Sequence, residues 1–156
     1  MSEHANLDPD ALKMMSFTVF SKLEGAVTAG MIHLGDQLGL YRELATRVSP
    51  VNVEDLAAAV GLHPRWVREW ASNQVAARVV SCSDLTDEAM PLFLTPEAKC
   101  VLASPQHPAF GMGMFHRLPQ TMGALRDMPE SFETGLGHDY DSHGPEGAVG
   151  IERSFE

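Results

Sequence analysis

Residues 53–70 read VEDLAAAVGLHPRWVREW and carry the strongest structural signal in the chain. Asn52 is a good N-cap for a helix that opens this stretch. Gly61 ends that helix at a position where left-handed backbone is needed, and Pro64 begins a second helix that we expect to run to about Ala77. Helix, glycine turn and helix at this spacing predict a helix-turn-helix.

The residues that follow predict a wing. Residues 79–82 and 91–94 are short hydrophobic segments separated by a polar turn, so we expect two short strands there. Thr95 is then a cap for another helix, which begins at Pro96 and runs to about residue 103. Residues 52–103 together predict a winged-helix domain.

The region before this domain, residues 1–51, predicts a long helix. Asp8 caps it, and apolar residues recur at steps of three and four from Leu12 to Leu38. Because the apolar surface is so broad, we expect the helix to thread a larger core or to pair with another subunit. Its glycines predict a break near Gly30 or a close helix contact.

Residues 104–156 have the composition of a connector. A linker leads to a helical stretch over 108–126, interrupted by Pro119, and residues 134–147 are rich in glycine and polar side chains. From Ile151 we expect the first turns of another helix, which leads onward rather than closing a domain. The fold class expected for the whole chain is mainly α, a winged helix-turn-helix with flanking helices and a small two-stranded wing.

The net charge of −10 bears on the class of partner. Duplex-binding proteins carry clustered basic residues, whereas the eleven basic residues here are scattered. The second helix of the helix-turn-helix still presents types that read base edges: Arg65, Arg68, Asn73 and Gln74. Acidic residues on the same surface oppose phosphate: Glu69, Asp84, Asp87 and Glu88. Nucleic-acid binding is therefore not favoured.

Cysteine usage and hydropathy indicate the compartment. Cys82 and Cys100 lie 18 positions apart without metal-ligand spacing, so reduced thiols are favoured over a disulfide. The acidic N-terminus does not resemble a signal peptide, and charges interrupt the apolar stretch over residues 14–40. We therefore expect a cytoplasmic protein that is not in the membrane.

The sequence offers few candidates for chemistry. Residues 138–143, HDYDSH, could be a metal cluster, but a loop that contacts substrate or is merely structural is favoured. His116 could be a general base, although a lone His among Met and Phe is more often a packed residue with a hydrogen bond. Nucleotide loops, nucleophile motifs and zinc-protease motifs are missing from the sequence. We expect no catalytic, cofactor-binding or metal-binding residues in this chain.

Several segments resemble one enzyme family. Residues 20–44, which end in GLYREL, resemble the N-terminal helices of bacterial class I S-adenosylmethionine-dependent methyltransferases that act on small molecules. Residues 53–70 are similar to the winged-helix region of those proteins, and residues 94–98, LTPEA, match the end of its wing. Residues 135–147 and 150–153 resemble the connection that precedes the catalytic domain.

The resemblance implies a role for each part of the chain. It implies a homodimer formed through the N-terminal helices and a lid over a small-molecule methyl acceptor. The residues that it places at the border of the substrate pocket are Phe115, His116, His138, Tyr140 and His143. In this family a Rossmann-like domain holds S-adenosylmethionine, and this sequence does not contain it. We therefore expect no cofactor binding and no methyl transfer by this chain alone.

Two other functions are compatible with the residues. The first is a small regulatory protein that uses the winged helix to bind DNA or a protein partner. The second is a protein that holds a small apolar ligand among its nine methionines. Salt-dependent duplex binding would favour the first, and ligand-dependent thermal stabilisation would favour the second.

Overall fold

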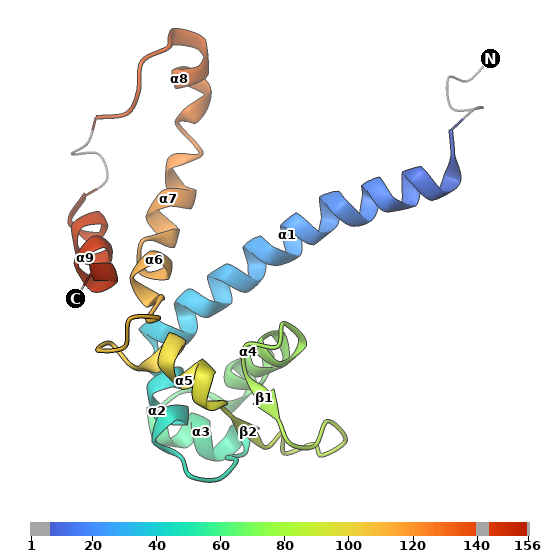
Figure 1. The fold of residues 1–156 in the computed structure, drawn as a ribbon, viewed down its shortest axis with the longest axis vertical. Helices are drawn as coiled ribbons and strands as arrows, with labels where there is room; N and C mark the ends of the chain where they lie inside the picture. The colour runs from blue at the N-terminus through green and yellow to red at the C-terminus, as the bar shows by residue number, and fades with distance from the viewer. Residues whose placement is uncertain (1–6, 140–143, 156) are drawn as a thin grey trace.

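The computed structural model describes residues 7–139 and 144–155. The elements in these ranges are α1 (Pro9–Gln37), α2 (Leu40–Thr46), α3 (Val53–Val60), α4 (Pro64–Ala76), β1 (Ser81–Cys82), β2 (Leu92–Phe93), α5 (Pro96–Ala103), α6 (Met112–His116), α7 (Leu118–Ala124), α8 (Met128–Thr134) and α9 (Gly144–Phe155). Figure 1 shows α2–α5 and the two strands gathered at the base of α1, with α6–α8 rising on the other side and α9 beside α6. The mainly α, winged-helix fold is confirmed.

The helix-turn-helix forms where its local signals predict it. The Asn52 side chain accepts a hydrogen bond from the main-chain N–H of Asp55 at 3.2 Å, which caps α3. Gly61 ends α3 with a φ of 70°, in the left-handed region that glycine adopts without strain. His63 caps α4 by accepting from the N–H of Arg65, and α4 begins at Pro64.

The wing is present but shorter than predicted. Ser81 pairs with Phe93 and Cys82 with Leu92 in an antiparallel ladder, so each strand has two residues. The main-chain N–H groups of residues 79 and 80 both donate to the carbonyl oxygen of Gln74, at 2.9 and 3.2 Å. These groups close the end of α4 and therefore cannot join the ladder.

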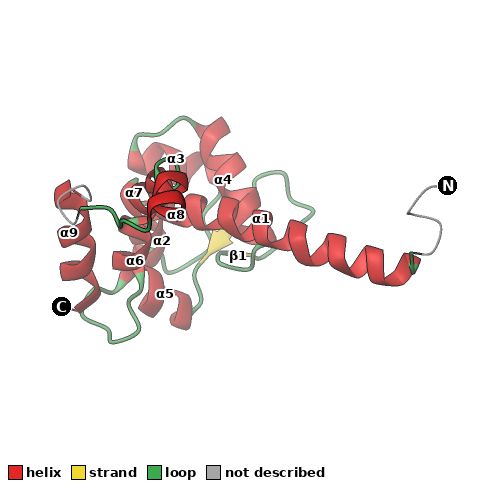
Figure 2. Cartoon of the chain, turned by 90° about the horizontal axis from the view of Figure 1, so that it is seen from above, coloured by secondary structure: helices red, strands yellow, loops and turns green. Residues whose placement is uncertain are grey.

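Helix α1 runs for 29 residues without a break at Gly30. Figure 2 shows its N-terminal part extending far from the rest of the molecule. A close contact occurs at Gly35 instead, where a Cβ would lie 2.7 Å from Cε2 of Tyr41. Only the C-terminal end of α1 is packed in the domain, so α1 does not thread a core within the part of the chain that the structure describes.

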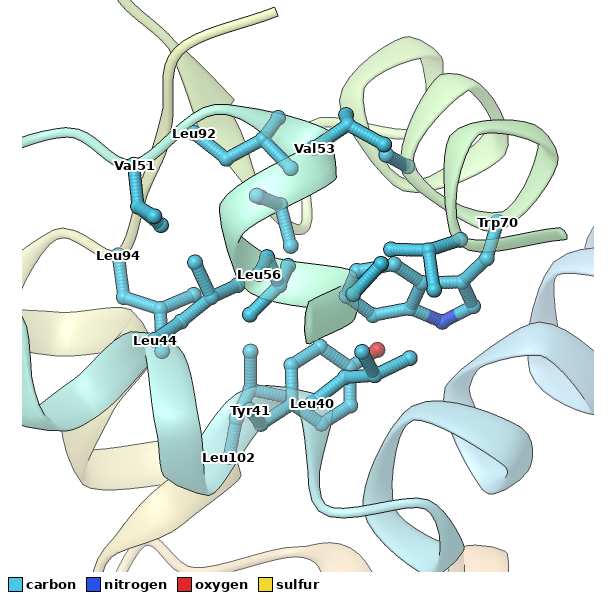
Figure 3. Packing of buried hydrophobic residues seen from close by; sticks show 14 of the residues in the cluster. Leu40, Tyr41, Leu44, Val51, Val53, Leu56, Trp70, Leu92, Leu94 and Leu102 are labelled. Carbon is cyan, nitrogen blue, oxygen red and sulfur yellow. The ribbon is translucent and has the colours of Figure 1, made fainter. Parts of the chain in front are cut away.

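The hydrophobic core lies between α2, α3, α4, α5 and the wing (Figure 3). The rings of Tyr41 and Trp70 meet at its edge nearest α1, with centroids 5.4 Å apart and planes tilted by 58°. The indole N–H of Trp70 donates to the carbonyl oxygen of Met31 at 3.0 Å, which joins α4 to α1. The aliphatic residues of the core include Leu40, Leu44, Leu56, Leu92, Leu94 and Leu102.

The C-terminal region has more helix than predicted. The expected helical stretch divides at Arg117 into α6 and α7, and Pro119 lies in the first turn of α7, where it costs no hydrogen bond. Helix α9 begins at Gly144, seven residues before the predicted start at Ile151. The glycine-rich composition hid this start, because glycine lowers helix propensity without preventing a helix that is packed against a neighbour.

Two further predictions concern chemistry and the membrane. Cys82 and Cys100 are both free thiols, as predicted. None of the helices in the described ranges is long and apolar enough to cross a membrane.

Candidate functional site

The predicted site residues Phe115 and His116 lie on α6, which packs closely against α9. Gly150 of α9 is buried, and a Cβ there would lie only 3.0 Å from the carbonyl oxygen of Gly113 on α6. Because neither residue has a side chain, the two backbones approach each other directly. This contact places the charged residues of α9 beside the ring of His116.

The strongest polar contact in this region joins α9 to α1. Asp36 is only 5% exposed, and its carboxylate accepts two hydrogen bonds from Arg153, at 2.9 Å from Nη1 and 3.0 Å from Nη2. This bidentate arrangement is the strong form of an ion pair. Arg42 lies at the edge of the same carboxylate, with its Nη1 at 3.7 Å from Oδ1 and at 3.2 Å from the main-chain oxygen of Asp36.

The His116 ring uses both of its nitrogens within the protein. Nδ1 lies 3.1 Å from Nη1 of Arg153, and Nε2 lies 2.7 Å from a carboxylate oxygen of Glu146. Since an arginine can only donate, Nδ1 accepts from Arg153 and the Nε2–H donates to Glu146. His116 is therefore a hydrogen-bonded, partly buried residue, the alternative that the sequence favoured over a general base.

Phe115 ties the same helix to α1. Its side chain is half-buried against the hydrophobic core. Its main-chain oxygen accepts a hydrogen bond from Nδ1 of His33 on α1, at 2.9 Å. Phe115 and His116 are thus adjacent and held in place from both sides.

The other predicted site residues are not brought to the same place. His138 lines a separate hollow of about 260 Å³ at the end of α8, which it shares with residues such as Glu130 and Asp139. Tyr140 and His143 lie outside the described residues. Among residues 7–139 and 144–155, no three side chains of His, Cys, Asp or Glu converge as metal ligands.

Sequence reasoning missed Glu146 and Arg153 as partners of His116, and Asp36 as the partner of Arg153. One signal was available: Asp36 interrupts an apolar stripe at the buried end of α1, and a buried carboxylate needs a partner. The sequence did not indicate that Arg153 is this partner, because Arg153 lies 117 positions away.

The face of α4 expected to read base edges is partly occupied. Gln74 is fully buried and accepts a hydrogen bond from the hydroxyl of Tyr41, so its assignment as a base-reading residue was wrong. Burial, with a smaller contribution from the charge of Asp36, raises the pKa of Tyr41 well above its ordinary value. Arg68 donates to the carbonyl oxygen of Glu88 at 2.6 Å and forms an ion pair with Glu54.

Helix α1 carries a run of exposed apolar side chains. Its side chains are exposed around the whole N-terminal part of the helix: Leu12, Met14, Met15, Phe17, Val19, Phe20, Leu23 and Val27. At its base, a hollow of about 510 Å³ opens between α1 and α4, with walls that include Leu34, Leu38, Trp66 and Trp70. Trp66 is 66% exposed. Exposed apolar side chains in this number on one helix are typical of surfaces that contact another molecule.

Comparison with known proteins agrees with the winged-helix fold. A family model described as the Rv2258c-like winged HTH domain matches residues 26–102. No curated protein sequence matches the chain.

Three solved structures have a similar fold. That of the mitomycin 7-O-methyltransferase MmcR is 20% identical, with a TM-score of 0.71 over 94% of this chain and 45% of that one. That of human N-acetylserotonin methyltransferase in complex with SAM is 16% identical, with a TM-score of 0.65 over 99% and 43%. That of PigF with SAH is 14% identical, with a TM-score of 0.54 over 96% and 44%.

The chain therefore spans less than half the length of each of these structures. The matched residues run from the middle of α1 to the end of α5, and contain both helices of the helix-turn-helix and both strands of the wing. Residues 26–102 match the model of the Rv2258c-like winged HTH domain, in a chain whose fold is that of a part of methyltransferase structures.

Proposed function

We propose that this chain is the N-terminal module of a cytoplasmic S-adenosylmethionine-dependent methyltransferase, and that it provides dimerisation and a lid for a small-molecule methyl acceptor. The observation that carries the proposal is the unburied apolar surface of α1, attached to a winged-helix domain of this family. The fold likeness over 94% and 99% of this chain to parts of two methyltransferase structures supports it. Residues 1–51 are then the dimerisation segment, 52–103 the winged-helix domain and 104–156 the connector.

The dimer would form through α1. Phe17 is 70% exposed and Phe20 is 67% exposed, and burying one such side chain stabilises an association by roughly 1.5–3 kcal/mol. The exposed positions cover more than one side of the helix, so one partner helix and the partner's domain can both be accommodated. The apolar hollow beside Trp66 lies at the base of α1 and extends the same surface.

The lid would be the α6–α9 region. We assign Phe115, His116, His138, Tyr140 and His143 to the border of the acceptor pocket, on the strength of the resemblance in sequence. Because both nitrogens of His116 are engaged by Arg153 and Glu146, its contribution to that border is the ring surface rather than a free base. Orientation of the acceptor is the chemistry that a lid supplies.

The chain alone would transfer no methyl group. S-adenosylmethionine supplies the electrophilic methyl in this family, and the Rossmann-like domain that holds it does not occur in residues 1–156. We expect isothermal titration of the isolated chain with S-adenosylmethionine to give no heat of binding. Measurable binding with one site per chain would contradict this part of the proposal.

Dimerisation is tested by sedimentation equilibrium with Phe17→Glu. A charge at the centre of the apolar surface is costly to bury, so the variant should sediment as a monomer where the wild type is a dimer. The matched control is Phe132→Glu on α8, because Phe132 is equally apolar and 85% exposed but lies outside α1. A monomeric wild type, or a Phe17→Glu variant that stays dimeric, would refute dimerisation through α1.

The link to a catalytic domain is tested on the gene. We expect the reading frame downstream of the codon for Glu156, or an adjacent frame, to encode a hydrophobic strand followed by an acidic-x-Gly-x-Gly loop. If neither frame encodes such a segment, the module proposal fails, and the regulatory and ligand-binding alternatives move ahead.

A further inference from the structure

We propose that Asp36, His116, Glu146 and Arg153 form a latch that fixes α9 to the buried end of α1, with His116 as a positioning residue held in one tautomer. We refer to these four residues as the α1–α9 latch. The inference concerns the chain itself and does not depend on the proposed function.

The location of the latch gives it this role. Helix α9 packs chiefly on α6, and two glycines make that contact by bringing the backbones together. The side chain of Arg117 also lies against Gly150, with its Cβ and Cγ 3.2 Å from where a Cβ would be. The pair between Arg153 and Asp36 adds a directional constraint to this close packing, because a bidentate pair holds both the distance and the orientation of the guanidinium.

Burial makes the constraint strong. Asp36 is 5% exposed and the side chain of Arg153 is 28% exposed, so water compensates poorly if the pair opens. Asp36 belongs to α1 and cannot follow α9, since Gly35 beside it is packed against Tyr41 and Trp70. Arg42 neutralises part of the carboxylate from its exposed side but makes no bidentate contact. Movement of α9 therefore leaves the buried carboxylate of Asp36 with only the longer contact to Arg42.

His116 extends the latch to α6. Nη1 of Arg153 donates to both Asp36 and His116. On the opposite side of the imidazole, Nε2–H donates to Glu146, which lies in the first turn of α9. The charged groups around the ring are thus Arg153 and Glu146 from α9, with Asp36 of α1 behind Arg153. Two residues of α9 clamp the imidazole between them, and this arrangement requires the proton on Nε2.

The latch couples two ends of the chain that the sequence separates. Any event that shifts the C-terminal end of α1 changes the free energy of placing α9, and the reverse holds by thermodynamic linkage. The positions of α1 and α9 are therefore coupled.

Hydrogen exchange tests the coupling. In Asp36→Asn and in Arg153→Gln, we expect amides of residues 144–155 to exchange about tenfold faster or more, while amides of α3 and α4 keep the wild-type rates. The matched controls are Glu24→Gln on the exposed part of α1 and Arg126→Gln after α7, which remove the same charges elsewhere. The double variant should exchange no faster than either single variant, because the pair is lost once only.

A second measurement uses the wild-type chain. The imidazole ¹⁵N spectrum of His116 should show an unprotonated Nδ1 and a protonated Nε2, and this preference should weaken in Arg153→Gln. Exchange rates in 144–155 that do not change, a uniform rise across α3, α4 and α9, additive effects in the double variant, or a protonated Nδ1 in neutral wild-type His116 would each overturn the latch.

Discussion

Gly35 of α1 lies directly against the ring of Tyr41 on α2: a Cβ at position 35 would be 2.7 Å from Cε2 and 2.8 Å from Cζ. The same Cβ would lie 2.9 Å from Cζ2 of Trp70 on α4. The missing side chain lets α1 rest on the two aromatic rings that form the edge of the core. The base of the long helix is therefore anchored by close packing, while its other end is exposed.

We predict that Gly35→Ala destabilises the domain by about 1–3 kcal/mol, because both rings are buried and a Cβ at position 35 would lie within 2.9 Å of each of them. Gly30→Ala on the same helix is the control, since nothing would lie within 4 Å of a Cβ at position 30. That change should be neutral or stabilising by up to about 1 kcal/mol, through helix propensity. Urea unfolding followed by circular dichroism measures both, and equal effects of the two substitutions would contradict the packing at Gly35.

Alkaline pH should destabilise the chain through Tyr41. Its pKa is raised in the folded state, so its contribution is fully present below the ordinary value of 10.0 and is lost as the pH rises above it. One such group changes the free energy of unfolding by about 1.4 kcal/mol for each pH unit in that window. Urea midpoints between pH 9 and pH 11 measure the effect.

The control for this prediction is Tyr41→Phe. This substitution removes the hydroxyl that donates to Oε1 of Gln74. It should lower the free energy of unfolding by about 1–3 kcal/mol at neutral pH, because the buried amide oxygen loses that donor. Above pH 10 its stability should fall less steeply than that of the wild type. Parallel pH profiles for the two proteins would show that Tyr41 titrates normally in the folded state.

Acid should weaken the contact between α3 and α4 through Glu54. The hydrogen bond from Arg68 lowers the pKa of Glu54, so its contribution is present above the ordinary value of 4.5 and is lost as the pH falls below it. Glu54 is 55% exposed, and solvent screening limits the effect to about 0.5 kcal/mol. Chemical shifts of Glu54 between pH 2 and pH 6 give its pKa, which should rise toward the ordinary value in Arg68→Ala and stay lowered in Arg65→Ala.

The chain should not bind duplex DNA. Gln74 is buried and Arg68 is held by Glu54 and the wing, so two of the four residues suited to reading bases are not free to do so. The net charge of −10 adds repulsion. We expect no change in fluorescence anisotropy of a labelled duplex at about 50 mM salt, where phosphate contacts are strongest. Binding that weakens steeply with added salt would support the regulatory alternative instead.

The winged helix was predictable because its signals are local. An N-cap at Asn52, a left-handed glycine at position 61 and a proline at position 64 each act on the backbone beside them. The wing was predicted in place but not in length, because its length depends on which carbonyl the N–H groups of residues 79 and 80 reach. Hydrogen-bond competition of that kind has no sequence pattern.

The role of α1 was half predictable. Its apolar residues show in the sequence that the helix must be covered, but only the tertiary structure shows that the domain covers one end and leaves the other exposed. Both ends carry apolar residues, and they differ in what packs against them.

Sequence alone therefore determined the long helix of residues 9–37, the helices of residues 52–103 with their caps at Asn52 and Thr95, and the winged-helix class, since these follow from neighbouring residues and from the period of the apolar positions. Only the tertiary structure decided that Gln74 is buried against Tyr41 and that His116 is held between two residues of α9. It also brought Arg153 to Asp36 across 117 positions. Contacts of such long range depend on how the helices pack, and packing is a property of the whole fold.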